Sequence, residues 1–313
     1  MYELNNKKQQ NTPLKNKQDP QKQSNLFLGI VCIVLSAFFY SLMSLFVRLS
    51  GDLSTFQKSF FRNLIAAFVG FILLIKSKSF KWKKGNLPAL LGRSIAGTVG
   101  ILCNFYAIDN MNISDASILN KLAPFFSIIF SILLLKEKAS WKDWLLVAVA
   151  FGGALFIVKP SFDISKSAPA LIGAAGGLGA GLAYTFVRML GQKGERNAMI
   201  VFFFSAFSCL VMLPMTILQY VPMSWEQVGF LLLAGLAASG AQFSVTAAYT
   251  FAPAKEISVY DYSQVLFTAV WGILFLQEFP DYFSIIGYVI IIGAAVIKYL
   301  LSQKNQRDLK LLL

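Results

Sequence analysis

Ten stretches of mostly apolar residues follow one another along the chain, each of roughly 17–25 residues. As a helix, each stretch is long enough to span the hydrocarbon core of a bilayer, which is about 30 Å thick. Only 14% of the residues are charged, against about 25% in an ordinary soluble domain. The sequence therefore predicts an all-α polytopic membrane protein with ten transmembrane helices. They are expected at residues 27–47, 57–75, 87–108, 115–135, 142–158, 168–188, 198–219, 227–250, 257–277 and 283–301.

Both ends of the chain are polar. Residues 1–26 are rich in Lys, Gln and Asn and lack the apolar segment of a signal peptide, so we expect a disordered basic cytoplasmic tail. Residues 302–313 form a second, short cytoplasmic tail. All three cysteines lie in apolar stretches and histidine is absent. The sequence therefore predicts no disulfide framework, no metal site and no cofactor.

The positive charges are distributed unevenly between the loops. If the N-terminus is cytoplasmic, 21 of the 28 lysines and arginines fall in cytoplasmic segments and four in external ones. Short cytoplasmic loops carry an excess of Lys and Arg, so this bias predicts that both termini are cytoplasmic. The basic residues are dispersed over many loops, which argues against nucleic-acid binding. The expected environment is the lipid bilayer of a bacterial plasma membrane.

The second half of the chain repeats the first. The segment SILLLKEKASWKDWLLVAVAFGGALFIVK (131–159) aligns with GILFLQEFPDYFSIIGYVIIIGAAVIKYL (272–300) at a constant offset of 141 residues, which places Gly152 on Gly293. Each half then holds five spans, and an odd number requires the two halves to insert in opposite orientations. Inverted repeats are typical of secondary transporters. The two inverted five-helix repeats are expected at 27–159 and 168–301.

Several motifs accompany this repeat. Arg62 lies in the second span (FFRNLIAAFVGF), a polar break with a proline in the fourth (LNKLAPFFSIIFSILLLKEK) and a Gly-Gly pair in the fifth, and QVLFTAVWGILFLQE and IIGAAVI repeat the pattern more weakly. Over residues 27–301 this layout resembles the drug/metabolite transporter superfamily, with two EamA-type domains. The resemblance implies a secondary carrier for small metabolites, amino acids or amphiphilic compounds. The second half departs from the pattern, because Phe202 and Val265 stand where an arginine and the proline would be expected.

A polar break interrupts the fourth span at SILNKLAPFF (117–126). Pro124 has no N–H, so the carbonyl of Asn120 loses its helical partner and is expected to hold the Lys121 ammonium. Lys121 lies 15 residues from Lys136, which is about 22 Å of helix rise and places it in the outer half of the span. A cation at that depth is costly unless it lines a cavity, pairs with a carboxylate or reaches the surface. The sequence leaves these three alternatives open.

Away from the ends of the spans, three other charged side chains stand out, those of Arg62, Arg93 and Asp261. Helix rise puts Arg62 at the level of Lys121, so the two are expected to form one electropositive rim on the outer side of a central cavity. Arg93 and Asp261 fall in the inner half, where an ion pair between them would close the inner side. The alternative for Arg93 is an anchor at the membrane interface.

Uncharged polar residues complete the candidate site, because a buried phenol or amide needs a hydrogen-bond partner. The candidates for lining the cavity are Tyr40, Tyr184, Tyr260, Tyr262, Gln242 and Gln264. Three glycines recur at four-residue spacing in the sixth span, Gly173, Gly177 and Gly181, which favours close helix packing. No Walker A or HExxH motif is present, so the sequence predicts neither an ATP-driven pump nor an enzyme.

These features predict a secondary transporter, specifically an exporter of small organic solutes that works by alternating access. Three cationic residues within the spans favour an anionic or zwitterionic solute, such as an amino acid. One alternative is a cationic or multidrug efflux carrier that uses Asp261, and another is a non-transporting membrane scaffold or accessory subunit. The sequence leaves the coupling ion and the oligomeric state open, a homodimer included.

The charge distribution makes the topology testable. Reporter fusions at residues 1 and 313 should both give the cytoplasmic signal, because the positively charged loops are retained inside. A fusion after Ser50, in the first external loop, is the control and should give the external signal. If both terminal fusions read as external, the orientation is inverted.

Overall fold

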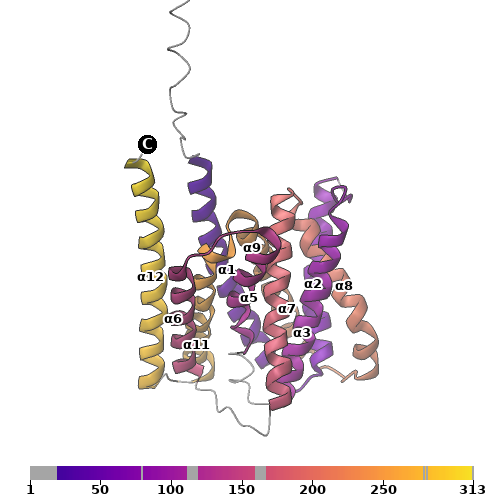
Figure 1. The fold of residues 1–313 in the computed structure, drawn as a ribbon. Coiled ribbons are helices and arrows are strands. Elements are labelled where there is room, and N and C mark those ends of the chain that lie inside the picture. The colour runs from indigo at the N-terminus through magenta and orange to yellow at the C-terminus, as the bar shows by residue number, and fades with distance from the viewer. Residues whose placement is uncertain are drawn as a thin grey trace, which may run out of the picture.

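The computed structural model describes residues 20–78, 80–110, 119–158, 167–277, 279 and 281–311. Within them the chain is helical and crosses the molecule ten times, which confirms the predicted all-α polytopic class (Figure 1). The first half holds α1 (Pro20–Leu49), α2 (Thr55–Lys76), α3 (Leu87–Asn110), α5 (Ala123–Leu135) and α6 (Trp141–Val158). The second half holds α7 (Ser167–Gln192), α8 (Asn197–Leu218), α9 (Trp225–Phe251), the broken helix α10 (Ala254–Ile257), η2 (Ser258–Tyr262) and α11 (Ser263–Leu276), and α12 (Tyr282–Leu311).

Seven of the described helices are long and apolar enough to cross a bilayer on their own, and α5 is shorter at 13 residues. The shorter crossings made by α5 and α11 follow the two interrupted segments of the chain. Both termini of the described chain lie on one face, because α1 begins and α12 ends there (Figure 1). We call this the terminus face. Residues 1–19 of the predicted N-terminal tail lie outside the described residues.

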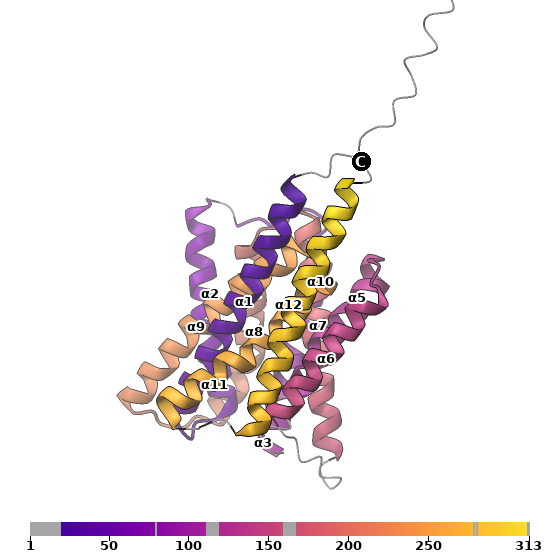
Figure 2. The same ribbon diagram turned by 90° about the vertical axis from the view of Figure 1, so that its left-hand side faces the viewer.

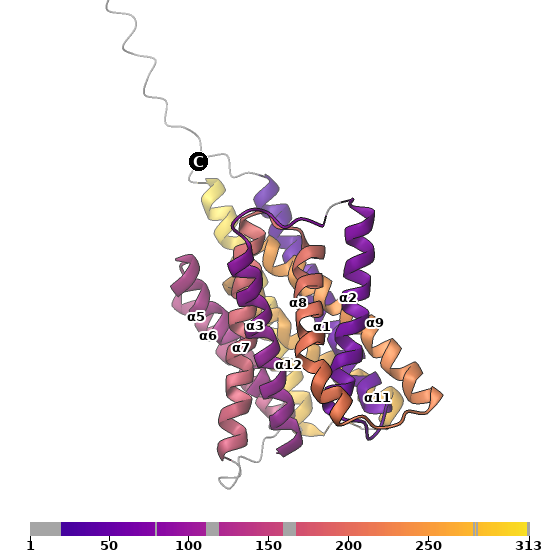
Figure 3. The same cartoon turned by 90° about the vertical axis from the view of Figure 1, so that its right-hand side faces the viewer.

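The two halves are intertwined. The most extensive helix contacts are α1 with α9, α3 with α7, α2 with α8, and α6 with α12, and each of them joins one half to the other. The repeat matches α1 with α7 and α3 with α9, so the first two contacts are equivalent. The α6–α12 pair forms one edge of the molecule (Figure 2) and the α2–α8 pair the opposite edge (Figure 3). Neither half therefore forms a separate bundle.

The repeat is visible in the backbone as well as in the sequence. Lys136 and Gln277, 141 residues apart, follow α5 and α11 in the same left-handed conformation, with φ of 55° and 56°. The cap at Lys136 satisfies the carbonyl of Ser131 through the N–H of Glu137, and the cap at Gln277 satisfies the carbonyl of Gly272, 141 residues after Ser131. A left-handed residue that satisfies a carbonyl of the last turn is a common way to end a helix. The two halves thus end this helix by the same device.

The helices that follow these caps begin with exchanged residues. At the start of α6, the Asp143 carboxylate accepts hydrogen bonds from the backbone and the hydroxyl of Ser140, both at 2.8 Å. At the start of α12, the Asp281 carboxylate accepts from the backbone and the hydroxyl of Ser284. The Asp and Ser positions are swapped between the repeats, yet both satisfy donors that the first helical turn leaves unpaired.

Equivalent breaks occur in the fourth crossing of each half. In the first half, a turn at Lys121 and Leu122 separates a short helical segment from α5, and Pro124 lies in the first turn of α5, where its missing N–H costs nothing. In the second half, the 3₁₀ segment η2 separates α10 from α11. Short 3₁₀ stretches within a helix often mark functional positions. The offset of 141 places Asp261 and Tyr262 of η2 on Asn120 and Lys121.

The glycines of α7 lie against the broken helix of the first half. A Cβ atom added to Gly177 would lie 2.7 Å from the Leu119 carbonyl oxygen, and one added to Gly181 would lie 2.6 Å from the Phe126 Cβ. A Cβ atom added to Gly173 would lie 2.9 Å from the Leu119 side chain and 3.0 Å from the Ala107 Cβ. Small residues of this kind allow helix backbones to approach closely in a membrane. The close packing of these three glycines therefore positions the break in the first half of the chain, which carries Lys121.

This packing generates a stability prediction. The variant Gly177→Leu should yield little folded, monodisperse protein, because its side chain would overlap the Leu119 backbone. Gly293→Leu in α12 is the matched control, since no atom lies within 4 Å of a Cβ added there. Fluorescence-detected size-exclusion chromatography of the two variants measures the difference. Equal yields and elution profiles for both variants would contradict the packing.

Candidate functional site

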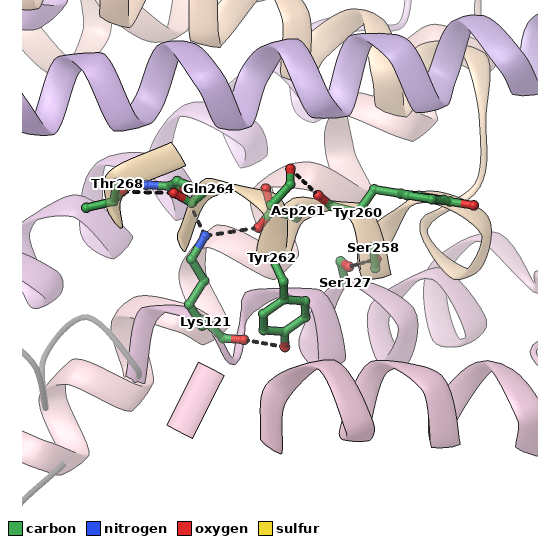
Figure 4. A network of polar contacts seen from close by, with 9 residues as sticks. Lys121, Ser127, Ser258, Tyr260, Asp261, Tyr262, Gln264 and Thr268 are labelled. Atoms are coloured by element: carbon green, nitrogen blue, oxygen red, sulfur yellow. Dashed lines mark hydrogen bonds and ion pairs between the residues drawn. The ribbon is translucent and has the colours of Figure 1, made fainter. Parts of the chain in front are cut away.

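Lys121 lies at the centre of a polar network between the two breaks (Figure 4). Its ammonium donates a 2.7 Å hydrogen bond to the Gln264 side-chain carbonyl and lies 3.5 Å from an Asp261 carboxylate oxygen. Lys121 belongs to the first half, whereas Asp261 and Gln264 belong to the second. The side chains of Lys121 and Asp261 are 14% and 13% exposed, so each charge depends on the other for compensation in the membrane interior.

The backbones of the two breaks are also connected. The Tyr262 hydroxyl donates a 2.9 Å hydrogen bond to the backbone carbonyl of Lys121, a group left without a helical partner by the turn (Figure 4). Tyr262 is the residue that the repeat aligns with Lys121. The hydroxyls of Ser127 and Ser258 lie 3.4 Å apart on the same two elements. The contact between Tyr262 and Lys121 is therefore made at equivalent positions of the two repeats.

A second group of polar residues surrounds two arginines. The Arg93 guanidinium donates a 3.2 Å hydrogen bond to the Gln242 side-chain carbonyl and lies 3.9 Å from the centre of the Phe204 ring. The Gln242 amide in turn donates to the Tyr40 hydroxyl at 2.9 Å. Arg62 lies over the Tyr40 ring, 5.9 Å from its centre. These contacts join α1, α2, α3, α8 and α9, and we call this group the arginine cluster.

The arginine cluster is deeply buried and incompletely satisfied. Arg93 is 3% exposed and Arg62 is 8% exposed. The Nε atoms of both side chains are buried without a hydrogen-bond partner, and within the described residues no carboxylate lies within 4 Å of either guanidinium. A buried donor without a partner is costly, so such a group in a native protein calls for an explanation, such as strain, a role in the site, or a bound water or ion.

Two tyrosines connect the Lys121–Asp261 pair with the arginine cluster. Tyr40 and Tyr184 each interact electrostatically with both Arg93 and Asp261. Tyr184 also stacks on Tyr249, with ring centres 4.8 Å apart and an angle of 15° between the planes. Tyr249 is fully buried and was not among the residues singled out in the sequence. The phenol in an apolar segment was the signal that could have identified it.

Several sequence-based expectations about contacts were wrong. The ion pair between Arg93 and Asp261 is replaced by Lys121–Asp261, and Arg93 bonds Gln242 instead. The shared electropositive rim of Lys121 and Arg62 stays a prediction, and their direct partners differ, since Lys121 bonds the second break and Arg62 lies over Tyr40. The ammonium of Lys121 is held by side chains and not by the Asn120 carbonyl. Helix rise gives the level of a residue only when its helix runs perpendicular to the membrane, and it does not show which neighbour the side chain faces.

Ion pairs tie helix ends together at the terminus face. Lys298 of α12 lies 2.8 Å from Asp143 of α6 and 3.0 Å from Glu256 of α10. Arg188 of α7 pairs with Glu137 at 3.1 Å and donates to the Thr250 carbonyl at the end of α9. Glu256 lies on the same interrupted segment as Asp261, so this contact connects the terminus face directly to the central break.

On the face opposite the terminus face, hydrogen bonds connect helix ends and loops of the two halves. Gln57 exchanges two 3.0 Å hydrogen bonds with the backbone of Val221, and Gln227 donates to the Ser50 carbonyl. A hollow of about 530 Å³ lies here between the loops at 53–56 and 219–221. Its lining has no ionisable carboxylate, lysine or arginine, so we place the candidate site at the central network instead.

Comparison with known protein families shows which family the chain belongs to. The model of the EamA-like transporter family matches the chain twice, at residues 27–159 and 168–300. The chain belongs to the EamA-like transporter family. Like the curated relatives described below, it is a membrane transporter of small solutes and not an enzyme.

Curated proteins and a solved structure agree with this assignment. The chain is 33% identical to the pseudopaline exporter CntI of Pseudomonas aeruginosa over 270 residues, which cover 86% of this chain and 94% of the exporter. It is 22% identical over 275 residues to the S-adenosylmethionine uptake transporter of Rickettsia prowazekii, covering 86% of this chain and 91% of that protein. A crystal structure with 15% sequence identity and a TM-score of 0.78 shares the fold over 90% of this chain and 99% of its own.

The Lys121–Asp261 pair leads to a prediction about the stability of the protein. Asp261→Asn or Lys121→Met alone should lower the free energy of unfolding by about 1–3 kcal/mol, because each leaves a charged group without its partner. The double variant should lose less than the sum of the two single losses, because it leaves neither charge unpaired. The apparent melting temperature of the purified transporter measures this coupling.

Asp52→Asn is the control for this cycle, since Asp52 is an exposed carboxylate outside the network. It should leave the melting temperature within the error of the parent. Strictly additive losses at Lys121 and Asp261 would show that the two charges do not stabilise one another.

Proposed function

We propose that this transporter exports small zwitterionic or anionic metabolites, such as amino acids, and that the Lys121–Asp261 pair recognises them. The observation that carries the proposal is a cation and a carboxylate 3.5 Å apart, contributed by opposite halves and almost buried. An intramembrane ion pair between transporter repeats is a functional candidate because neither charge would be tolerated there alone.

A zwitterion fits this pair by exchange of partners. An α-amino acid carries its ammonium and its carboxylate on the same carbon atom. Its ammonium can replace that of Lys121 on Asp261, while its carboxylate takes the Lys121 ammonium. Every charge then keeps a partner, so the substrate enters without leaving an unpaired ion in the low-dielectric interior. The Gln264 carbonyl, which now accepts from Lys121, can accept a donor from either group.

Alternating access would follow from the position of this exchange. The pair lies where the two broken helices meet, and the ends of those helices are tied at the terminus face through Glu256 and Lys298. Relative motion of the inverted halves around a central site is the usual cycle of such transporters. We place this transporter in a bacterial plasma membrane with both termini in the cytoplasm.

Export as the direction of transport is supported by the relatives. The protein at 33% identity is named as an exporter, whereas the one named for uptake is only 22% identical. A cationic substrate is less well supported, because Asp261 already has the Lys121 ammonium as its partner and two arginines lie nearby.

Substitution of Lys121 tests the role of the pair in transport. In proteoliposomes, Lys121→Met should reduce the initial rate of amino-acid efflux roughly tenfold or more, because it removes the cation that receives the carboxylate. Lys121→Arg keeps the charge and should retain part of the rate. The measurement is efflux of radiolabelled amino acids of different net charge from loaded vesicles.

Lys193→Met is the matched control, since Lys193 is an exposed lysine at the end of α7. It should transport at the parental rate. Parental transport by Lys121→Met would refute a role of the pair in substrate recognition. If no solute is transported by the parent protein, the proposed function is wrong and the non-transporting alternatives gain support.

A further inference from the structure

We infer that the arginine cluster is a second anion subsite, so that the preferred substrate of this transporter is an amino acid with an additional carboxylate. This inference rests on the proposed function, because it assigns the zwitterionic head of the substrate to the Lys121–Asp261 pair. It adds a place for the rest of the molecule, and hence the chemical class of the substrate.

The first argument is the unfilled hydrogen-bonding capacity of the two guanidinium groups. An arginine carries five N–H donors in a planar fork that matches a carboxylate. Within the described contacts, Arg93 uses one of them on a neutral amide and Arg62 meets only the face of Tyr40. The Nε–H of each points to no acceptor, although both atoms are buried. A carboxylate would satisfy several of these donors at once.

The second argument is charge balance. The central region holds three cations, Lys121, Arg62 and Arg93, and within the described residues the one carboxylate paired there is Asp261. An amino acid with a neutral side chain brings no net charge and leaves this excess unchanged. A second carboxylate lowers it by one unit. In a low-dielectric interior, that reduction favours an amino dicarboxylate over a neutral zwitterion.

The third argument is the connection between the two groups. Tyr40 interacts electrostatically with both arginines and with Asp261, and its hydroxyl accepts from Gln242. Tyr184 interacts with Arg93 and Asp261. Both tyrosines are therefore close to the pair as well as to the arginine cluster. A substrate that bridges the two groups would extend along these phenols, which offer apolar ring faces to its methylene groups.

Three ligands of matched shape separate the charges. L-Glutamate carries an ammonium and two carboxylates, L-glutamine replaces the second carboxylate by a neutral amide, and glutarate lacks the ammonium. Each is titrated against the purified full-length transporter, and its effect on the melting temperature gives the affinity. Glutamate should bind roughly tenfold or more tightly than either analogue, because each lacks one charged hydrogen-bonded contact.

Variants assign this preference to residues. Arg93→Gln should bring the glutamate-to-glutamine affinity ratio close to one, and Arg62→Gln, the second variant, should lower the same ratio. Asp261→Asn should instead reduce the glutamate-to-glutarate ratio, because it removes the partner of the ammonium. Lys193→Gln, at an exposed site, should leave both ratios unchanged.

The inference is overturned if glutamine binds as tightly as glutamate, if glutamate does not bind, or if both arginine variants keep the parental ratio. These outcomes differ from a failure of the proposed function. If proteoliposomes transport neutral zwitterions without preference for a dicarboxylate, the proposed function stands and the second subsite falls. If they transport no zwitterion of any charge, the proposed function itself falls.

Discussion

The ion pair between Lys121 and Asp261 is the interaction on which the centre of this transporter depends. Each half contributes one charge, and neither charge is stable alone in the interior of a membrane. The pair can form because both fourth crossings are interrupted at equivalent positions, which brings Lys121 and Asp261 to within 3.5 Å of one another. The Tyr262 hydroxyl then satisfies the backbone carbonyl that the first break leaves without a partner. Charge compensation and backbone satisfaction are thus achieved at the same contact between the repeats.

The repeats have the same backbone devices but different chemistry. Equivalent left-handed caps at Lys136 and Gln277 and exchanged Ser and Asp caps fix the helices of both halves in the same way. The side chains at the breaks differ, since the first half supplies a cation and the second an anion. This asymmetry gives the centre both signs of charge, whereas the arginine cluster beside it is positive only. A centre of this composition suits a molecule with an ammonium at one end and carboxylates at both.

Much of the fold followed from hydropathy alone. The ten predicted spans correspond to the ten crossings, because a helix must be apolar over a bilayer thickness to be stable there. The levels of single side chains were less well predicted. Lys121 and Asp261 were assigned to opposite halves of the membrane by counting helix rise, yet the structure brings them to within 3.5 Å of one another. Rise along a helix equals depth only when the helix runs perpendicular to the membrane, and membrane helices are usually tilted. Arg93 shows a second limit, because the level of a residue does not reveal which neighbour its side chain faces.

The sequence by itself determined the helical class, the duplication with inverted halves and the presence of polar residues in the spans, because each depends on local composition or on similarity at a fixed offset. It also identified Lys121, Asp261, Arg62, Arg93, Tyr40 and Gln242 as candidates. Only the tertiary structure decided their partners. The two halves pack through α1–α9, α3–α7, α2–α8 and α6–α12, and this intertwining sets which helix faces meet at the centre. Contacts between residues more than a hundred positions apart depend on the rotation and crossing of whole helices, which no local pattern encodes.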